Sequence, residues 1–491
     1  MKTLFLIVSG FLCCLATAQD KFPFENYFEN KTLRIDYYHT GDAKSEEITA
    51  DKMYVQGPWA GNPDNCVNAP ELGMYKVNVF DQATGKLIYT KGYNTIFEEY
   101  KTISDAINGI RKTYHESVLI PLPKKTVRLV IEIRDRQHKL TPIYSVQIDP
   151  SDYHIVRQKI GYVADKVFPI VNNGDPHKKV DLAILAEGYQ ANEIDLFKID
   201  LENYTRLFFS VEPYKSRAND FNIYGVFSAS AESGTDEPRQ KIYKNTRLGS
   251  SFNYFDLDRY CLADDNKSIR DVASNVPYDA ILIMVNRERY GGGGIYNWQT
   301  VYTARSERTD YVFLHEFGHG FAGLADEYFD SPVSYVDLDA GGVEPLEANI
   351  TILPDKNNVK WKKYLSPGIP VPTDWGKDKY DSLVSVRRTV LLDGEKKISE
   401  LRRSEASASE LEKAREEVRK QVDLISQKIN DFYLNHPLKD KVGVYEGANY
   451  QGKGVYRPTI MSLMHGFQEK PDYHIVNANA INDMIDYYTG N

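Results

Sequence analysis

Three short segments in the middle of the chain are apolar almost without interruption: DLAILA at 181–186, FNIYGVFS at 221–228 and YDAILIMV at 278–285. A strand that is apolar on both faces must be covered on both faces, which happens when helices connect parallel strands. Residues 194–209, between the first two segments, carry apolar side chains at helical spacing. This alternation predicts an α/β region with a mostly parallel sheet, and a further edge strand at 295–304.

The preceding part of the chain has a different pattern. Short β-rich runs at 32–38, 74–81, 87–93 and 127–133 are separated by turn signals rich in glycine, proline and asparagine. This pattern predicts an antiparallel β-sandwich domain over residues 24–165, followed by a second domain over 166–491. Trp59, beside a turn, is either a ligand platform or a core residue, and we favour the core role.

Residues 395–432 predict one long amphipathic helix within an insertion at about 395–435. The stretch is charged, contains no internal glycine or proline, and has apolar residues seven apart at Leu411, Val418, Ile425 and Phe432. Two interpretations are open, an inserted helix that packs on its own domain and a coil that forms oligomers. We favour the first because four heptads are close to the minimum for a stable coiled coil.

The first 18 residues predict a secretory signal peptide that is cut after Ala18. Lys2 precedes an apolar run at 4–15, and Ala16 and Ala18 form a small-residue cleavage pattern. We therefore expect a secreted, periplasmic or cell-surface protein with no membrane span. A lipid anchor at Cys13 or Cys14 is a less favoured alternative, because the residues just before them are not the small ones that such a site needs.

Charge and cysteine content limit the partners. The 69 acidic residues outnumber the 60 basic ones, so the formal net charge of −9 argues against electrostatic binding of nucleic acid. Removal of the leader leaves Cys66 and Cys261, which form either one disulfide or two buried thiols.

The stretch VFLHEFGHGFAGLADEY at 312–328 predicts a zinc site. His315 and His319 are four residues apart, so on a helix both imidazoles project from one face and can hold Zn²⁺. Glu316, next to a ligand, suits the role of general base in hydrolysis. The surrounding apolar residues would bury these polar groups, which is costly without a metal.

A catalytic zinc requires a third protein ligand. Gly320 and Gly323 loosen the helix after His319, so the chain can bring Asp326 or Glu327 back to the metal. We favour Asp326, with Glu327 as the alternative. If neither acid is the ligand, His465 or His474 takes that place.

The same stretch resembles the H-E-x-x-H-x-x-G-x-x-H/D signature of metzincin zinc peptidases, with one departure. Ala322 stands where the signature has glycine and Ala325 where it has the third ligand. Together with VGVYEGANY at 442–450, YRPTIMSLMHG at 456–466, DYYHTGDA at 36–43 and Trp59, it resembles the bacterial IgA peptidase family of secreted zinc metallopeptidases. The resemblance implies a β-domain, a metzincin-like zinc peptidase domain and protein or peptide substrates, with immunoglobulin A as a candidate.

Further roles follow from this resemblance. Met464 in the segment SLMH resembles the Met-turn that packs beneath the metal, with Met461 as its rival. Tyr456 is a candidate to stabilise the oxyanion, or a structural tyrosine. Independently of the resemblance, Gly294 and Tyr296 lie on a predicted edge strand that can pair with an extended peptide; the alternative is that the glycines here simply form a loop.

A calcium site at Asp330, Asp337 and Asp339 is disfavoured because their spacing fits no defined loop.

We therefore expect a secreted, two-domain zinc endopeptidase. Two other classes remain open, a surface glycan- or protein-binding module whose catalytic centre has lapsed, and a metal-dependent hydrolase of a non-peptide bond. The oligomeric state is not determined by the sequence.

Overall fold

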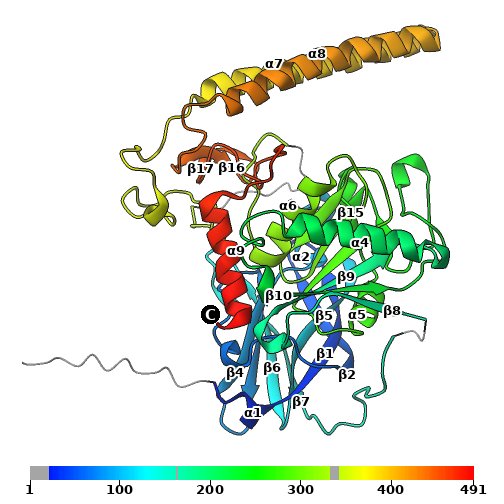
Figure 1. Ribbon diagram of the computed structural model, residues 1–491, viewed down its shortest axis with the longest axis vertical. Coiled ribbons are helices and arrows are strands. Elements are labelled where there is room, and N and C mark those ends of the chain that lie inside the picture. The colour runs from blue at the N-terminus through cyan, green and yellow to red at the C-terminus, as the bar shows by residue number, and fades with distance from the viewer. Residues whose placement is uncertain (1–21, 162–163, 332–341) are drawn as a thin grey trace, which may run out of the picture.

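The computed structural model describes residues 22–161, 164–331 and 342–491 (Figure 1). The predicted leader lies outside the described residues, as do Asp337 and Asp339. Within the described ranges, no helix combines the length and the apolar character needed to cross a bilayer.

The N-terminal region is built from two antiparallel sheets, in strand orders β2-β1-β5 and β4-β3-β6-β7. The strands are β1 Phe28–Gly41, β2 Glu46–Gln56, β3 Tyr75–Asp81, β4 Leu87–Tyr93, β5 Lys112–Pro123, β6 Val127–Arg134 and β7 Leu140–Ile148. Three short helices accompany them, α1 Phe24–Tyr27, α2 Ile96–Tyr100 and α3 Ser104–Ile107. The predicted runs coincide with β1, β3, β4 and β6. Three strands were not predicted: β2 and β7 are largely polar and half exposed, and β5 is polar at its start although its second half is buried.

The central sheet has the strand order β14-β15-β13-β9-β10-β8. The strands are β8 Lys166–Val171, β9 Val180–Glu187, β10 Phe221–Phe227, β13 Ala280–Val285, β14 Gly292–Ile295 and β15 Gln299–Thr303. The four inner strands are parallel, and β8 and β14 are antiparallel edges. The predicted edge strand at 295–304 is wrong in detail, because β15 pairs with β13 inside the sheet and β14 forms the edge.

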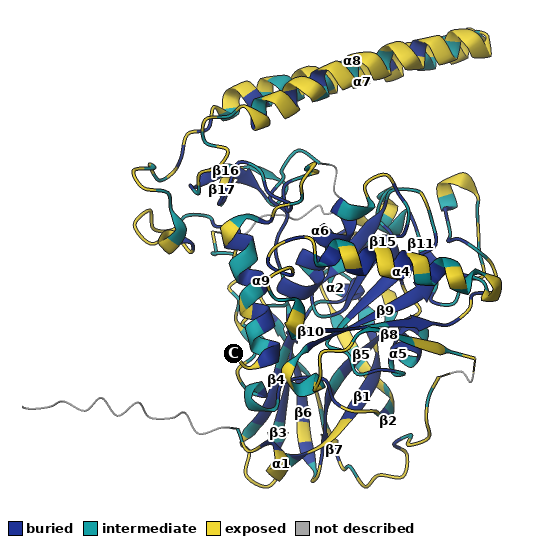
Figure 2. Ribbon diagram, viewed as in Figure 1, coloured by how far each residue is buried: buried dark blue, intermediate teal, exposed yellow. Residues whose placement is uncertain are grey.

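Both faces of the inner strands β9, β10, β13 and β15 are buried, as the apolar runs predict for three of them, whereas the edge strand β8 is half exposed (Figure 2). Leu182 and Ile184 of β9 point into a core shared with α4 Ile194–Phe208, α6 Thr309–Ala322 and α9 His474–Thr489. Ala183 and Leu185 point the other way, into a core shared with α5 Asn266–Ala273 and the N-terminal sheets. The N-terminal region therefore covers one face of the central sheet.

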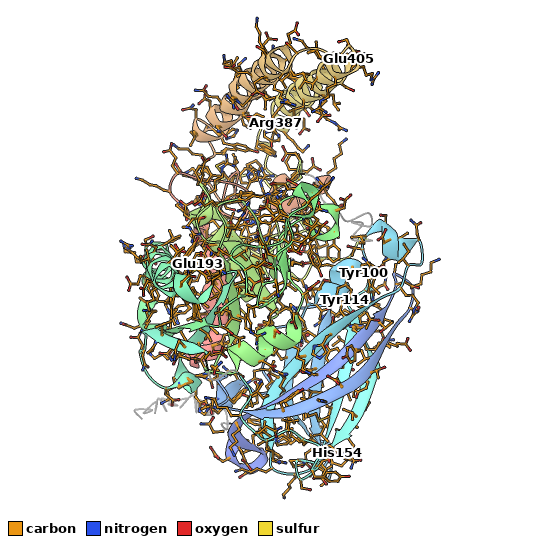
Figure 3. All side chains as sticks on the ribbon, turned by 90° about the vertical axis from the view of Figure 1, so that its right-hand side faces the viewer. Tyr100, Tyr114, His154, Glu193, Arg387 and Glu405 are labelled. Carbon is orange, nitrogen blue, oxygen red and sulfur yellow. The ribbon has the colours of Figure 1, made fainter. Side chains whose placement is uncertain are left out.

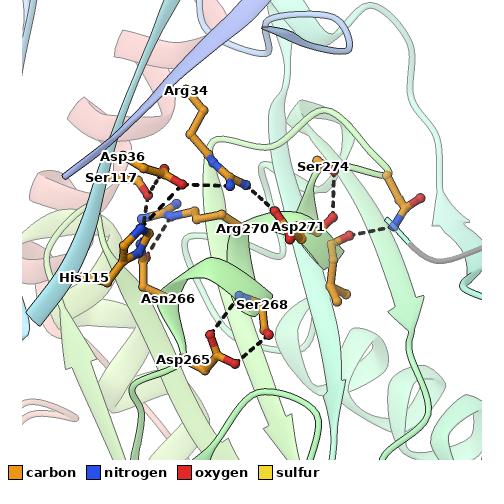
Figure 4. Close-up of polar contacts among 12 residues, drawn as sticks. Arg34, Asp36, His115, Ser117, Asp265, Asn266, Ser268, Arg270, Asp271 and Ser274 are labelled. Carbon is orange, nitrogen blue, oxygen red and sulfur yellow. Dashed lines mark hydrogen bonds and ion pairs between the residues drawn. The ribbon is translucent and has the colours of Figure 1, made fainter. Parts of the chain in front are cut away.

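A buried polar network joins β1 to α5 at this interface (Figure 4). The Arg34 guanidinium donates to Asp36 on its own strand and to Asp271 on α5, both at 2.8 Å. Asn266 of α5 donates to Ser117 of β5 at 2.8 Å, and Ser117 donates to Asp36 at 2.6 Å. The two regions are thus joined by charge pairs as well as by apolar contact.

The insertion forms a hairpin of two helices, α7 Lys377–Arg403 and α8 Ala408–Leu434, that stands off the rest of the molecule (Figures 1 and 3). The predicted single helix over 395–432 is wrong, because the chain reverses direction between the two. Ser407 caps α8 and forms a capping box with Glu410, which starts a new helix. The heptad positions pack against α7 of the same chain, with Val418 against Gly394.

The base of this hairpin is anchored in an apolar cluster that includes Trp375, Tyr433 and Tyr445. Tyr445 belongs to β16 Tyr445–Ala448, which pairs with β17 Gln451–Arg457. A further short pair consists of β11 Ser250–Ser251 and β12 Leu262–Ala263.

Cys66 and Cys261 are both buried free thiols. Trp59 is a core residue that stacks on Phe24, with ring centroids 5.3 Å apart.

Candidate metal centre and active site

Helix α6 carries the histidine motif and packs on β14 and β15. Its buried aromatic residues, Phe313, Phe317 and Phe321, anchor it in the core, so the motif is held on a rigid element. Gly323 ends the helix at φ 58°, a left-handed conformation that glycine adopts without strain. The chain then turns back along the helix.

The turn brings Asp326 to the two histidines. The Nε2 atoms of His315 and His319 lie 3.1 Å apart, and Asp326 Oδ1 lies 3.0 Å from the first and 3.3 Å from the second. His315 and Asp326 are buried, and His319 is nearly so. These three ligand atoms therefore converge on one point.

The donor set fits a zinc ion. The Nδ1 atoms of His315 and His319 lie 3.0 Å and 2.5 Å from the carbonyl oxygens of Leu463 and Leu324, so each Nδ1–H donates outward and each Nε2 lone pair faces Asp326. Asp326 Oδ1 is buried without a hydrogen bond. Three lone pairs directed at one another repel unless a cation lies between them, and two imidazoles with a carboxylate are typical ligands of catalytic zinc.

The electrostatics agree with a site for a cation. Burial alone would raise the pKa of Asp326, but the neighbouring imidazoles hold it well below its usual range. Burial alone would lower the pKa of His319, but Asp326 outweighs this effect and raises it to about 9. The site therefore favours positive charge.

Glu327, the alternative third ligand, lies outside this cluster. Its carboxylate accepts hydrogen bonds from Ser462 at 2.6 Å, Asn477 at 2.9 Å and Asn349 at 3.1 Å. Its backbone amide donates to the carbonyl of Met464 at 2.8 Å. Both oxygens are thus engaged in fixing the turn at 462–464 beneath α6.

Met464 is buried and packs against α6 at Gly318. Met461 instead packs with the cluster at the base of the hairpin. Of the two methionines, Met464 is therefore the one that contacts the helix carrying the histidines.

Glu316 lines a cavity of about 350 Å³ together with His315, His319 and Asp326. Burial is the main cause that raises the pKa of Glu316, and Asp326 adds to it, whereas the two histidines oppose it. A carboxylate whose pKa is raised toward neutrality is suited to take and return a proton.

Gly294 and Tyr296 also line the cavity. A Cβ on Gly294 would lie 2.2 Å from the carbonyl oxygen of Glu316, so only glycine lets the edge strand lie this close to α6. Gly292 bonds outward to Arg259 and Cys261, and backbone groups alternate along a strand, so the amide and carbonyl of Gly294 face the same outer side.

The remaining predicted residues lie elsewhere. Tyr456 pairs through its backbone with Thr351 and is not among the residues that line the cavity, so its predicted oxyanion role lacks support. His465 contacts the Tyr433 hydroxyl at 3.3 Å, and His474 begins α9. Asp330 accepts hydrogen bonds from Tyr380 and Arg387.

Several cavity residues were not identified from the sequence. Tyr328 stacks on His315, and its hydroxyl lies 3.2 Å from that of Tyr450, which donates to Asp326. Both tyrosines lie in motifs that carried the family resemblance, which was the available signal. Arg259 and Glu99 also line the cavity, and the sequence holds no signal for either.

A second group of possible ligands, Asp36, Asp51 and His115, lies in the N-terminal region (Figure 4 shows Asp36 and His115). Here the Asn266 amide donates to His115 Nδ1 at 3.1 Å, so the ring proton of a neutral His115 is on Nε2. Nε2 lies 3.7 Å and 3.5 Å from the two carboxylates. A neutral His115 therefore carries its proton on the nitrogen that faces the carboxylates, whereas His315 presents a lone pair to Asp326. The group is better described as part of the ion-pair network than as a metal site.

Comparisons with known proteins agree with the motifs. The family model described as IgA peptidase M64 matches residues 168–485, and that of the peptidase M64 N-terminus matches residues 23–145. A search of curated proteins finds no match. The resemblance stated from the motifs is thereby confirmed, and protein or peptide substrates follow from it. The chain belongs to the IgA peptidase M64 family.

Proposed function

We propose that this peptidase is a zinc-dependent endopeptidase that is secreted and acts on extracellular proteins. One observation carries the proposal: His315, His319 and Asp326 converge within 3.3 Å of one another, and all three line one cavity with Glu316. Binding by two imidazoles and one carboxylate leaves room for water or substrate, as hydrolysis requires.

The chemistry is divided between the metal and Glu316. Zinc bound by these residues supplies Lewis acidity toward water and a peptide carbonyl. Glu316 takes a proton from the attacking water as the water oxygen bonds to the carbonyl carbon. Glu316 then gives that proton to the amide nitrogen as the carbon–nitrogen bond breaks.

The outer edge of β14 supports binding of an extended peptide. Backbone groups of Gly294 face outward beside the motif, and such groups pair with any sequence in an extended conformation. Pairing on this edge is limited to the position of Gly294, because the outward groups of Gly292 already bond to Arg259 and Cys261. The placement of α6 beside the edge strand β14 supports a metzincin-like description of residues 166–491. The two N-terminal sheets support the description of residues 24–165 as a β-sandwich.

The predicted leader supports export, with cleavage near Ala18. Immunoglobulin A is a candidate substrate because of the family, although specificity depends on the shape of the cavity rather than on the metal ligands.

Replacement of Glu316 by glutamine tests the proposal. General-base catalysis contributes about 10²- to 10⁴-fold, so we expect Glu316→Gln to lose at least about 10²-fold in kcat on a peptide blocked at both ends, with one zinc per chain retained. Glu307→Gln, at an exposed position near the start of α6, is the matched control and should keep full activity. Elemental analysis that finds no zinc in the active wild-type enzyme would refute the proposal, as would near-normal turnover by zinc-loaded Glu316→Gln.

A further inference from the structure

Arg259 is held at the wall of the cavity by backbone pairing with β14. Its carbonyl accepts from the amide of Gly292 at 3.4 Å, and the amide of Cys261 donates to the carbonyl of Gly292 at 3.2 Å. The segment around Arg259 therefore continues the central sheet beyond its edge strand at Gly292. Farther along that strand, the outward-facing groups of Gly294 line the same cavity.

Among the ion pairs of the described residues, none includes Arg259, whereas its neighbour Asp258 pairs with Arg289 at 2.8 Å and with Arg239 at 3.7 Å. Arg259 instead lies beside the phenol of Tyr328. A half-buried cation without a counter-ion is costly to maintain, so its place in an active-site cavity calls for a functional explanation.

This cation lies within electrostatic reach of the reacting groups. Arg259 and Glu316 line the same cavity, together with the three candidate zinc ligands. Tyr328 stacks on His315, and Tyr328 contacts Tyr450, which donates to Asp326. Tyr328 thus lies next to both Arg259 and a candidate zinc ligand, His315.

We propose that Arg259 is a catalytic residue that donates hydrogen bonds to the scissile carbonyl oxygen as that oxygen gains negative charge. As the water oxygen bonds to the carbonyl carbon, the π electrons of the carbonyl move onto its oxygen, which Arg259 stabilises. The electron pair on this oxygen re-forms the carbonyl π bond when the carbon–nitrogen bond breaks and Glu316 protonates the leaving amine. The inference rests on the proposed function and fills the role that Tyr456 does not occupy.

Kinetics of Arg259 variants test this role. The substrate is an internally quenched peptide, selected from a peptide library and amidated at its C-terminus so that it offers no terminal carboxylate. Loss of one oxyanion donor costs about 10²- to 10³-fold in kcat, so we expect this loss in Arg259→Gln with KM changed little and zinc content retained. Arg259→Lys should recover part of the activity. Arg239→Gln, at a half-exposed arginine that does not line the cavity, is the matched control.

Two further measurements separate this role from others. In a Glu316→Gln background, calorimetry should show that Arg259→Gln weakens binding of the matching phosphinic peptide far more than binding of the substrate peptide. The plateau of the pH profile should fall, because a residue that only kept Glu316 ionised would shift the acid limb to higher pH and leave the plateau unchanged.

Unchanged kcat in folded, zinc-loaded Arg259→Gln would overturn the inference. A rise in KM alone, or a shift of the acid limb alone, would overturn it as well. Each of these results leaves the proposed function intact, because wild-type hydrolysis is measured in the same series. Absence of hydrolysis by the zinc-loaded wild-type enzyme would instead refute the proposed function.

Discussion

Asp326 and Glu327 are adjacent in sequence, but their carboxylates have different surroundings. Asp326 Oδ1 faces two imidazoles, whereas Glu327 accepts three hydrogen bonds in the turn beneath α6. We expect Asp326→Asn to lose zinc and activity together. Glu327→Gln should retain zinc but lose about 1–3 kcal/mol of stability, because an amide group would face buried donors. Elemental analysis and thermal melting check both, and equal zinc loss in the two variants would contradict the assignment.

His39 gives the N-terminal region a pH-dependent contribution to stability. Burial by itself lowers its pKa, but ion pairs with Glu116 and Glu46, each at 2.9 Å, outweigh burial and raise the pKa to about 9. A histidine whose pKa is raised in the folded state stabilises it fully below its unfolded value of about 6.5, and this contribution is lost as the pH rises through 9.

We therefore expect His39→Gln to be less stable than the wild type at pH 6, with the difference shrinking by pH 9.5. Urea denaturation at several pH values measures this difference. His154→Gln, at an exposed position labelled in Figure 3, is the control and should show no such dependence. A constant difference across the pH range would show that His39 acts through packing alone.

The helical hairpin is the element least coupled to the site. Helices α7 and α8 pack chiefly on each other, and only their base enters an apolar cluster, through Tyr380, Ile425 and Ile429. We expect a variant that joins residue 390 to residue 422 through a short glycine-rich loop to keep its zinc and its kcat on a small peptide. Thermal melting and elemental analysis check this expectation, and loss of zinc would show that the hairpin supports the site.

At the scale of the whole molecule, the two regions share one core. The N-terminal sheets cover the face of the central sheet that α4, α6 and α9 leave open, and Arg34 pairs across the interface without exposure to solvent. We therefore expect one cooperative unfolding transition for the full chain.

Replacement of Arg34 tests this coupling. Arg34→Gln leaves buried carboxylates without a partner, which costs about 3–5 kcal/mol, and the single transition should shift without splitting. Arg128→Gln, at an exposed position on β6, is the control. Differential scanning calorimetry distinguishes the outcomes, and two separate transitions would show that the regions fold independently.

The sequence by itself determined features that depend on local patterns. Apolar runs predicted β9, β10 and β13 because both faces of these strands are buried, and four-residue spacing placed His315 and His319 on one side of α6. The motifs also identified the family. The same local patterns missed β2 and the reversal between α7 and α8, since a half-exposed strand and a capped turn carry weak periodicity.

Only the tertiary structure decided how residues distant in sequence meet. The left-handed conformation of Gly323 sets the path of the chain as it returns along the helix. That path brings Asp326, and not Glu327, to the two histidines. Arg259 and Tyr450 reach the cavity through pairing with β14 and through the turn at 449–450, which no spacing in the sequence encodes. Contacts of this kind depend on the summed packing of many elements, so the sequence specifies them only through the complete fold.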